Sequence, residues 1–268
     1  MKQFERSRIS ALLVLAMLPA SGAMGAVMLG TDLGDGSFND INYGDPAATG
    51  LAYVAPTLYA GGLIDTPSVI DTITDLTYGY SVSGEATNLM EVTYSITNDD
   101  TANFDDLRFI VKVDPNGNLF VDPGGYTDTA SVIWPAKVDG DPDKYQVDEF
   151  DLFGGLQDSI YANNGLNDTD TCPGDTCDVD FALQWNLASL APGETWNITI
   201  GLSDDGSTLS TRYLLAESAD GPATSLTFSG TAMVAAIPLP ASIYLLGSGL
   251  LGLVGIGGRL RRQRVQKI

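Results

Sequence analysis

Apolar and polar residues alternate one for one along several stretches of this chain, and this alternation constrains the fold more than any other feature. The clearest stretch is 89–98, in which Met90, Val92, Tyr94 and Ile96 alternate with polar residues. A repeat of two puts these apolar side chains on one face of a β-strand, so the pattern predicts a strand with one buried face. The same alternation predicts strands within 76–82, 107–113, 179–187 and 196–202.

The connections between these stretches favour two sheets packed together. Asn98-Asp99-Asp100 ends one stretch, and Pro192-Gly193 fits the centre of a type II turn between two others. The sequence shows neither a long amphipathic helix nor a repeat of solenoid length. We therefore expect one all-β domain over residues 27–236, an antiparallel β-sandwich of the Ig-like or jelly-roll-like type. Residues 30–62, rich in Gly and Asp, are expected to form loops with one or two short strands.

Residues 1–26 have the order of a secretory signal peptide. Three basic residues precede a short apolar core, Ile9–Pro19, and small residues that suit cleavage follow at 21–23. The core is too short to span a bilayer, which argues against a permanent anchor. We expect the protein to be exported and this segment to be removed.

Segment 237–268 combines three features in a fixed order. A proline motif, Ile237-Pro238-Leu239-Pro240-Ala241, is followed by an uncharged span, Ala241–Gly258, and then by a cluster of cations. A helix of roughly 18 residues is about 27 Å long, close to the ~30 Å hydrocarbon core, so the span predicts one transmembrane helix. The basic flank is expected to stay in the cytoplasm. The cluster contains Arg259, Arg261, Arg262 and Arg264.

This order of motif, apolar span and arginine cluster resembles a PEP-CTERM sorting signal, in the variant whose motif reads V-P-L-P-A, with Ile237 in place of the valine. The resemblance implies cleavage by an exosortase, a membrane-embedded cysteine protease of Gram-negative bacteria. It also implies an inner-membrane intermediate facing the periplasm, followed by delivery to the cell surface or to the extracellular matrix of a biofilm. The sorting motif would be Pro238, Leu239, Pro240 and Ala241. An ordinary single-pass anchor would explain the span and the arginines, but not the proline motif.

A weaker resemblance concerns the predicted sandwich. Val92–Asn98 leads through a polar loop to Leu107-Arg108-Phe109, and Leu190–Thr195 precedes another predicted strand. Both stretches resemble Ig-like modules of bacterial surface proteins, which implies a fold and no activity. The irregular middle of the chain, 122–180, is longer than such a module has there, so the strand order stays open.

The predicted exported domain is strongly acidic. Residues 27–236 include 5 basic and 33 acidic side chains, a net charge of −28. Such a surface repels nucleic acid and anionic membranes, so no nucleic-acid partner is expected. It also repels an anionic polysaccharide unless cations bridge the two.

The two cysteines, Cys172 and Cys177, flank a short stretch in which Pro173-Gly174 favours a tight turn. Export to an oxidising compartment predicts a disulfide between them. Four intervening residues do not fit a redox C-x-x-C site, and two cysteines alone do not make a structural zinc site.

Calcium is the one cofactor that the sequence suggests, because carboxylates occur at alternate positions in two places. The candidate ligands are Asp139, Asp141, Asp143, Asp168 and Asp170. The first three are spaced like one arm of a calcium loop. Lys144 and Phe150, however, stand where an EF-hand has glycine and glutamate. The alternative is a set of solvated acidic turns.

No catalytic centre is predicted. The sequence contains no histidine, which excludes Ser-His-Asp and Cys-His catalysis. We expect a non-enzymatic protein with a structural or adhesive role at the cell surface or in the matrix, with an exosortase and exopolysaccharide as partners. One alternative is a carbohydrate-binding module with an aromatic platform from Trp134, Tyr145 and Tyr161. A second is a glycoside hydrolase that acts through two carboxylates.

Overall fold

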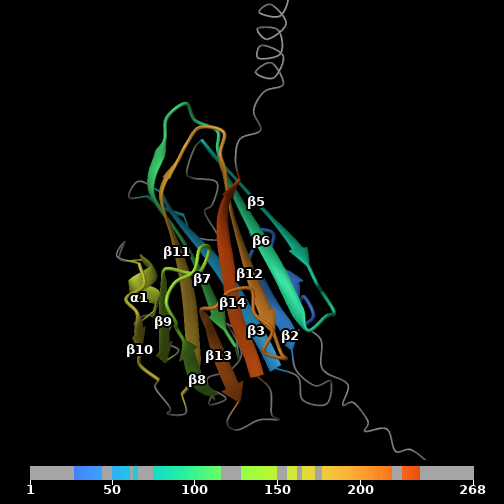
Figure 1. Ribbon diagram of the computed structural model, residues 1–268. Coiled ribbons are helices and arrows are strands. Elements are labelled where there is room, and N and C mark those ends of the chain that lie inside the picture. Colours follow the sequence, from blue (N-terminus) through green and yellow to red (C-terminus); the bar gives the residue numbers. More distant parts are fainter. Residues whose placement is uncertain are drawn as a thin grey trace, which may run out of the picture.

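The chain forms two β-sheets packed face to face (Figure 1). The computed structural model describes residues 27–43, 50–60, 63–65, 75–115, 128–149, 156–161, 165–172, 177–218 and 225–235. Within these ranges, no helix is long and apolar enough to cross a membrane. The expected signal peptide and the whole of segment 237–268 lie outside them.

The larger sheet has eight strands in the order β1-β2-β3-β7-β11-β9-β10, with β4 paired to β3. Neighbouring strands are antiparallel except β9 and β10, which are parallel. The strands are β1 (Thr31–Asp32), β2 (Phe38–Tyr43), β3 (Gly50–Ala60), β4 (Leu63–Asp65), β7 (Phe104–Asp114), β9 (Lys144–Glu149), β10 (Thr169–Asp170) and β11 (Val179–Leu190).

The smaller sheet has six strands in the order β5-β6-β12-β14-β13-β8, all antiparallel. The expected antiparallel β-sandwich is therefore confirmed. The strands are β5 (Leu76–Ser83), β6 (Leu89–Asn98), β8 (Asp128–Ile133), β12 (Thr195–Ser203), β13 (Tyr213–Ser218) and β14 (Ser225–Ala235).

Aromatic contacts between the sheets form the centre of the core. Phe109 of β7 packs against Tyr94 of β6 and Trp196 of β12, with ring centroids 5.1 and 6.4 Å apart. Phe181 of β11 stacks on Phe228 of β14 at 5.8 Å. Fully burying one such side chain contributes roughly 1.5–3 kcal/mol, so these contacts are a main source of the attraction between the sheets.

The expectation of loops with short strands over 30–62 is wrong for β3. This strand extends over Gly50–Ala60 and lies inside the larger sheet, between β2 and β7. Consecutive residues from Pro56 to Ala60 are all buried, so both faces of this part of the strand are covered. A strand covered on both faces loses the alternation by which strands are recognised in a sequence.

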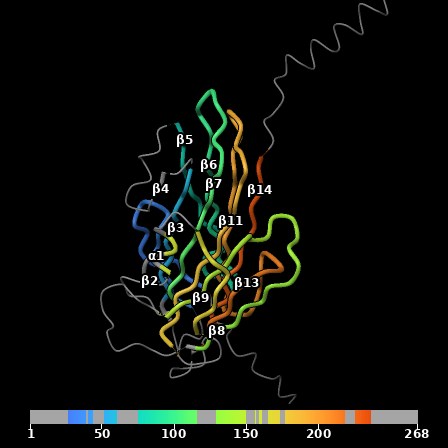
Figure 2. The backbone as a smooth tube through the Cα atoms, turned by 90° about the vertical axis from the view of Figure 1, so that its left-hand side faces the viewer, coloured from blue at the N-terminus to red at the C-terminus, as the bar shows by residue number. Residues whose placement is uncertain are grey.

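A short helix, α1 (Leu156–Tyr161), covers part of the outer face of the larger sheet. Figures 1 and 2 both show it beside β9, and Figure 2 shows it on the side away from β13 and β14. Its residues Leu156 and Ile160 form a small second cluster with Tyr59 of β3 and Ile110 of β7. The Tyr59 hydroxyl also donates a hydrogen bond to the carbonyl of Ile160. This cluster explains why the outward-facing side of β3 is buried.

Asn98 joins the two places where the chain crosses between the sheets, from β6 to β7 and from β11 to β12. Its backbone N–H donates to the carbonyl of Glu194 at 3.0 Å, and its carbonyl accepts from the N–H of Gly193 at 2.7 Å. Its side-chain amide donates to the carbonyls of Ala102 and Leu190, at 2.9 and 2.8 Å. The residue is fully buried, and its bond to the Leu190 carbonyl is buried with it.

Replacing Asn98 by alanine should lower the free energy of unfolding by about 2–4 kcal/mol. The substitution leaves the buried Leu190 carbonyl without a partner, which is costly, and also removes the bonds to the Ala102 carbonyl and from the Asp100 N–H. Urea denaturation of the purified protein measures the effect. Asn88→Ala is the control, because it removes an exposed hydrogen bond to Asp205 and should change stability by no more than about 0.5 kcal/mol. Equal stability of the two variants would contradict the role assigned to Asn98.

Candidate functional site

A pocket of about 320 Å³ lies between the two sheets, beneath the segment that connects β8 to β9. Its apolar lining comes from both sheets, with Leu187 of β11 and Ala232 of β14 partly exposed, and Trp185 of β11 and Trp196 of β12 almost fully buried. Its rim is polar on the side of the connecting segment, which arches outward in yellow-green in Figure 2. The pocket is therefore lined by a mixture of apolar and charged side chains.

The pocket exists because the strand beside β11 and the strand beside β14 both end early. Strand β9 pairs with β11 only as far as Gln184, and β13 pairs with β14 only as far as Ser229. Beyond these points the connecting segment lies along the edges of β11 and β14 in place of those strands. The Asn186 N–H of β11 donates to the Asp143 carboxylate at 2.8 Å, and the Ala232 N–H of β14 donates to the Gly140 carbonyl at 2.9 Å. The segment thus bridges the two sheets across the pocket.

Glycine is required at position 140 of the connecting segment. Its φ of +87° lies in the left-handed region, which side chains other than glycine rarely adopt. A Cβ atom there would also collide with the side chain of Thr231. The close approach of the segment to β14 therefore depends on this residue.

Asp141, a predicted calcium ligand, already has protein partners for its carboxylate. It accepts hydrogen bonds from the Val138 N–H at 2.9 Å, and from the N–H and hydroxyl of Thr211 at 3.2 and 2.6 Å. Burial by itself raises the pKa of Asp141, but the hydrogen bonds from Thr211 and Val138 outweigh it and hold the pKa below its ordinary value. Asp141 is therefore an ionised residue that fixes the connecting segment to the chain ahead of β13.

The other two carboxylates of this stretch differ from each other. Asp143 forms an ion pair with Lys137 and accepts from the Asn186 N–H, so both of its oxygens are engaged. Asp139 is exposed on the rim and makes no hydrogen bond or ion pair within the described residues. Of the three predicted ligands, Asp139 is the one whose carboxylate is open to a bound molecule.

Asp168 and Asp170 lie beside β9, on the side away from β11. The Asp168 carboxylate accepts from the Tyr145 N–H at 3.1 Å, and the Asp170 carboxylate accepts from the Cys172 N–H at 3.0 Å. Burial raises the pKa of Asp170. Each of these two carboxylates is therefore already engaged by a backbone N–H.

In the ranges that the structure describes, no group of three or more His, Cys, Asp or Glu side chains is placed to hold a metal ion. Calcium binding at Asp139, Asp141, Asp143, Asp168 and Asp170 stays a prediction.

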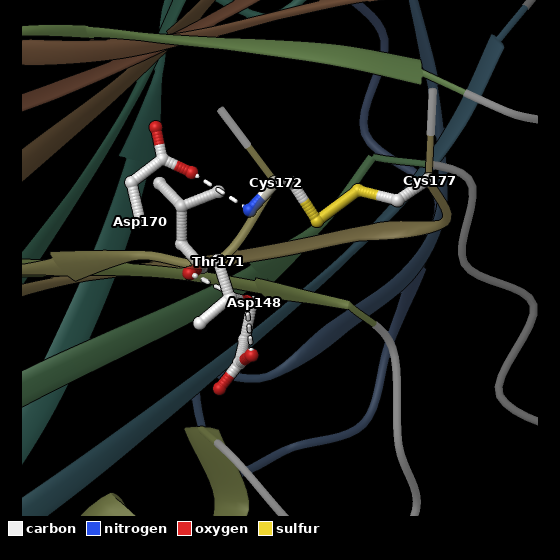
Figure 3. The surroundings of a disulfide bond; sticks show 6 residues. Asp148, Asp170, Thr171, Cys172 and Cys177 are labelled. Carbon is white, nitrogen blue, oxygen red and sulfur yellow. Dashed lines mark hydrogen bonds between the residues drawn. A yellow bond between two sulfur atoms is a disulfide. The ribbon is translucent and has the colours of Figure 1, made fainter. Parts of the chain in front are cut away.

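The predicted disulfide is confirmed. Cys172 and Cys177 are joined directly after β10, with their Cα atoms 6.2 Å apart (Figure 3). The Thr171 hydroxyl donates to the Asp148 carboxylate of β9, and the Cys172 N–H is bonded to Asp170. These contacts attach the disulfide loop to the edge of the larger sheet.

Trp134 and Tyr145, two of the three aromatic residues expected to form a platform, are both half-buried. The two rings pack against each other with centroids 4.7 Å apart, and the Arg212 guanidinium lies 4.7 Å from the centroid of Trp134. The side chain of Tyr161, the third candidate, lies outside the described residues. Trp185 and Trp196 line the pocket instead. Their alternation in the sequence indicates strand positions in the core, and nothing local indicates that the neighbouring strands end beside them.

A second polar cluster lies on the outer face of the larger sheet. Lys112 of β7 and Asp180 of β11 form an ion pair of 2.6 Å, with side chains only 11% and 3% exposed. Burial raises the pKa of Asp180 to about 6, although Lys112 opposes the shift. One oxygen of Asp180 and the side-chain oxygen of neighbouring Gln146 have no hydrogen-bond partner within the described residues. The contacts of this ion pair therefore offset only part of the free-energy cost of removing its charges from water.

Comparison with known proteins finds no family model that matches this chain and no match among curated proteins. The predicted sorting residues, Pro238, Leu239, Pro240 and Ala241, and the arginine cluster at 259–264 lie outside the described residues. We therefore infer function from the sequence of segment 237–268 and from the geometry of the sandwich.

Replacing Lys112 by methionine should lower the free energy of unfolding at pH 7 by about 3–5 kcal/mol, because it leaves Asp180 buried and charged without its partner. The folded-state pKa of Asp180, about 6, exceeds the ordinary value of 3.8, so the folded state binds this proton more tightly than the unfolded state. The stability that the folded state gains from binding this proton is complete below pH 3.8 and is lost as the pH rises through 6. Lys112 lowers the pKa of Asp180, so without it that pKa rises further and the variant gains more stability from protonation than the wild type does. The deficit of the variant relative to the wild type should therefore shrink when urea denaturation is repeated at pH 5.

The matched control is the double variant Lys112→Met, Asp180→Leu. Replacing both members of a buried ion pair by apolar residues is often neutral or stabilising. At pH 7 the double variant should be more stable than Lys112→Met alone. A single variant as stable as the double one would show that Asp180 carries no uncompensated charge.

Proposed function

We propose that this protein is a non-enzymatic β-sandwich that is exported, sorted by an exosortase through segment 237–268, and retained at the cell surface or in the exopolysaccharide matrix. Its role there is structural or adhesive. The observation that carries the proposal is the order of proline motif, uncharged span and arginine cluster in the sequence. The last described strand, β14, ends at Ala235, just before the motif begins.

Two features of the domain support export. The Cys172–Cys177 disulfide suits an oxidising compartment outside the cytoplasm. The net charge of −28 over residues 27–236 suits a protein that stays dispersed at high local concentration. An Ig-like relationship is also part of the proposal, supported by the crossings from β6 to β7 and from β11 to β12.

Carbohydrate binding is the second candidate function, and the pocket between the sheets favours it. Its lining combines apolar side chains with polar groups, as small-molecule sites do. No specific observation favours a glycoside hydrolase. Of the three carboxylates in the pocket, Asp141 and Asp143 are held by Thr211, Lys137 and Asn186.

Deleting residues 237–268 should release the protein as a soluble species, whereas the wild type should pass through a membrane-bound precursor and lose Arg259–Ile268. Mass spectrometry of the precursor and of the mature surface protein measures both. The variant Pro238→Ala, Pro240→Ala keeps the span and the arginines, and should accumulate as an uncleaved membrane protein. Normal maturation of this variant, or mature surface protein with its arginines intact, would show that segment 237–268 is an ordinary membrane anchor.

Retention in an anionic matrix should depend on divalent cations, because an acidic surface cannot hold an acidic polymer by direct ion pairing. The protein should co-sediment with the polysaccharide of the producing cells, separate from it in a chelator and return with added calcium. Sodium at the same ionic strength should not replace calcium, because it screens charge without bridging carboxylates. Absence of co-sedimentation in every condition would exclude a matrix-binding role.

A further inference from the structure

We infer that the free edge at the end of β14, residues 232–235, is a docking surface for the protease that cleaves the sorting segment. This inference rests on the proposed function, because it extends recognition by the exosortase from the proline motif into the folded domain. The partner is a membrane-embedded protease, which would add a strand of its own to this edge.

The outer edge of β14 has no partner strand beyond Ser229, where its pairing with β13 ends. The Gly140 carbonyl then accepts the Ala232 N–H at 2.9 Å, and Gly140 is the last described residue whose backbone is bonded to this edge. Because N–H groups two residues apart point to the same side of a strand, the Val234 N–H points outward as that of Ala232 does. The end of β14 therefore presents a backbone donor to an added strand.

The same end of β14 carries exposed apolar side chains on both of its faces. Met233 is 66% exposed and Val234 is 38% exposed, and neighbouring side chains of a strand point to opposite faces. Free edges are normally protected from pairing with another chain by charged residues, prolines or bulges. Thr231–Ala235 contains no charge and no proline, and it pairs with β12 without a break in register. This edge is therefore open to pairing.

The position of the proline motif identifies the partner. The motif begins two residues after Ala235, the last residue of β14. An extended chain spans at most ~3.5 Å per residue, so Pro238 lies within roughly 10 Å of Ala235 and Ala241 within roughly 21 Å. A protease that holds the motif must therefore come close to the end of β14. A second copy of the chain has no comparable reason to meet this edge.

The motif alone offers few backbone donors to a protease. Pro238 and Pro240 have no N–H, so neither can donate a hydrogen bond to a neighbouring strand. Chains that bind by strand addition obtain their affinity mainly from backbone hydrogen bonds. The free edge of β14, directly before the motif, supplies a donor of the kind that the prolines lack.

Charge favours this edge over the rest of the domain. Residues 27–236 carry a net charge of −28, which repels an anionic membrane surface. Strand β14 itself contains no charged residue. An uncharged strand beside the tether is therefore the place where the domain approaches a membrane protein with the least electrostatic repulsion.

The test follows conversion of the membrane-bound precursor into mature surface protein, by pulse–chase labelling of the producing cells. Met233→Asp places a charge at the exposed end of β14, and Val234→Pro removes the outward N–H without removing a bond to β12. Each variant should slow conversion about tenfold, the effect of losing one hydrogen bond or contact from an interface.

Leu33→Asp is the matched control. It adds the same charge at an apolar side chain that is 52% exposed and lies outside β14, so it should convert as the wild type does. Thermal unfolding of each purified precursor shows whether the variant is folded, and Met233→Asp decides the result if Val234→Pro is not folded. Conversion of Met233→Asp at the rate of Leu33→Asp overturns the inference.

Photo-crosslinking identifies the partner directly. A photo-reactive amino acid in place of Met233 should crosslink to the exosortase, as identified by mass spectrometry, and the adduct should disappear when the exosortase gene is deleted. The same amino acid in place of Leu33 should give no such adduct. Absence of the exosortase adduct at position 233, with or without a crosslink to lipid or to a second copy of the chain, overturns the inference.

The outcomes separate this inference from the proposed function. Mature wild-type protein that keeps Arg259–Ile268 would overturn the proposed function. Normal cleavage of the wild type, a block in the variant Pro238→Ala, Pro240→Ala and unchanged conversion of Met233→Asp would overturn the docking surface alone.

Discussion

Burial of one face of each sheet against the other is the constraint on which the rest of this structure depends. Phe109 and Phe181 of the larger sheet must meet Tyr94, Trp196 and Phe228 of the smaller one. The chain therefore has to cross repeatedly between the sheets, and every crossing exposes backbone groups that need partners. The buried hydrogen bonds of the corner between β6 and β12, and the segment that spans the pocket, both meet this need.

The strands that could be predicted from the sequence are those with one covered face. In β6, Tyr94 and Ile96 are buried while Thr93 and Ser95 are only partly buried. The sequence of this strand therefore alternates between apolar and polar residues. In β3 the outer face is covered as well, because Tyr59 packs under α1. A rule based on alternation finds the first kind of strand and misses the second. The order of the strands in the sheets was not predictable, because it depends on contacts between distant parts of the chain.

The candidate site was predictable only in its residue types. The spacing of Asp139, Asp141 and Asp143 marks an unusual acidic stretch, but not what each carboxylate does. Asp141 is engaged by Thr211, 70 positions further along the chain, and no local pattern encodes such a pair. Trp185 and Trp196 occur at core positions of their strands, and they line a pocket only because adjacent strands stop short. The sequence therefore indicates which side chains matter and leaves their roles to the fold.

The position of β14 has a mechanical consequence. This strand lies inside the smaller sheet, paired with β12 from Thr195↔Ala235 to Ser203↔Thr227 and with β13 on its other side. A tether attached after Ala235 would pull along the strand axis. Hydrogen bonds of an antiparallel ladder are perpendicular to the strands, so such a pull loads many of them together in shear instead of opening them one by one. A domain attached in this way resists detachment by flow through the same ladder that holds its sheet together.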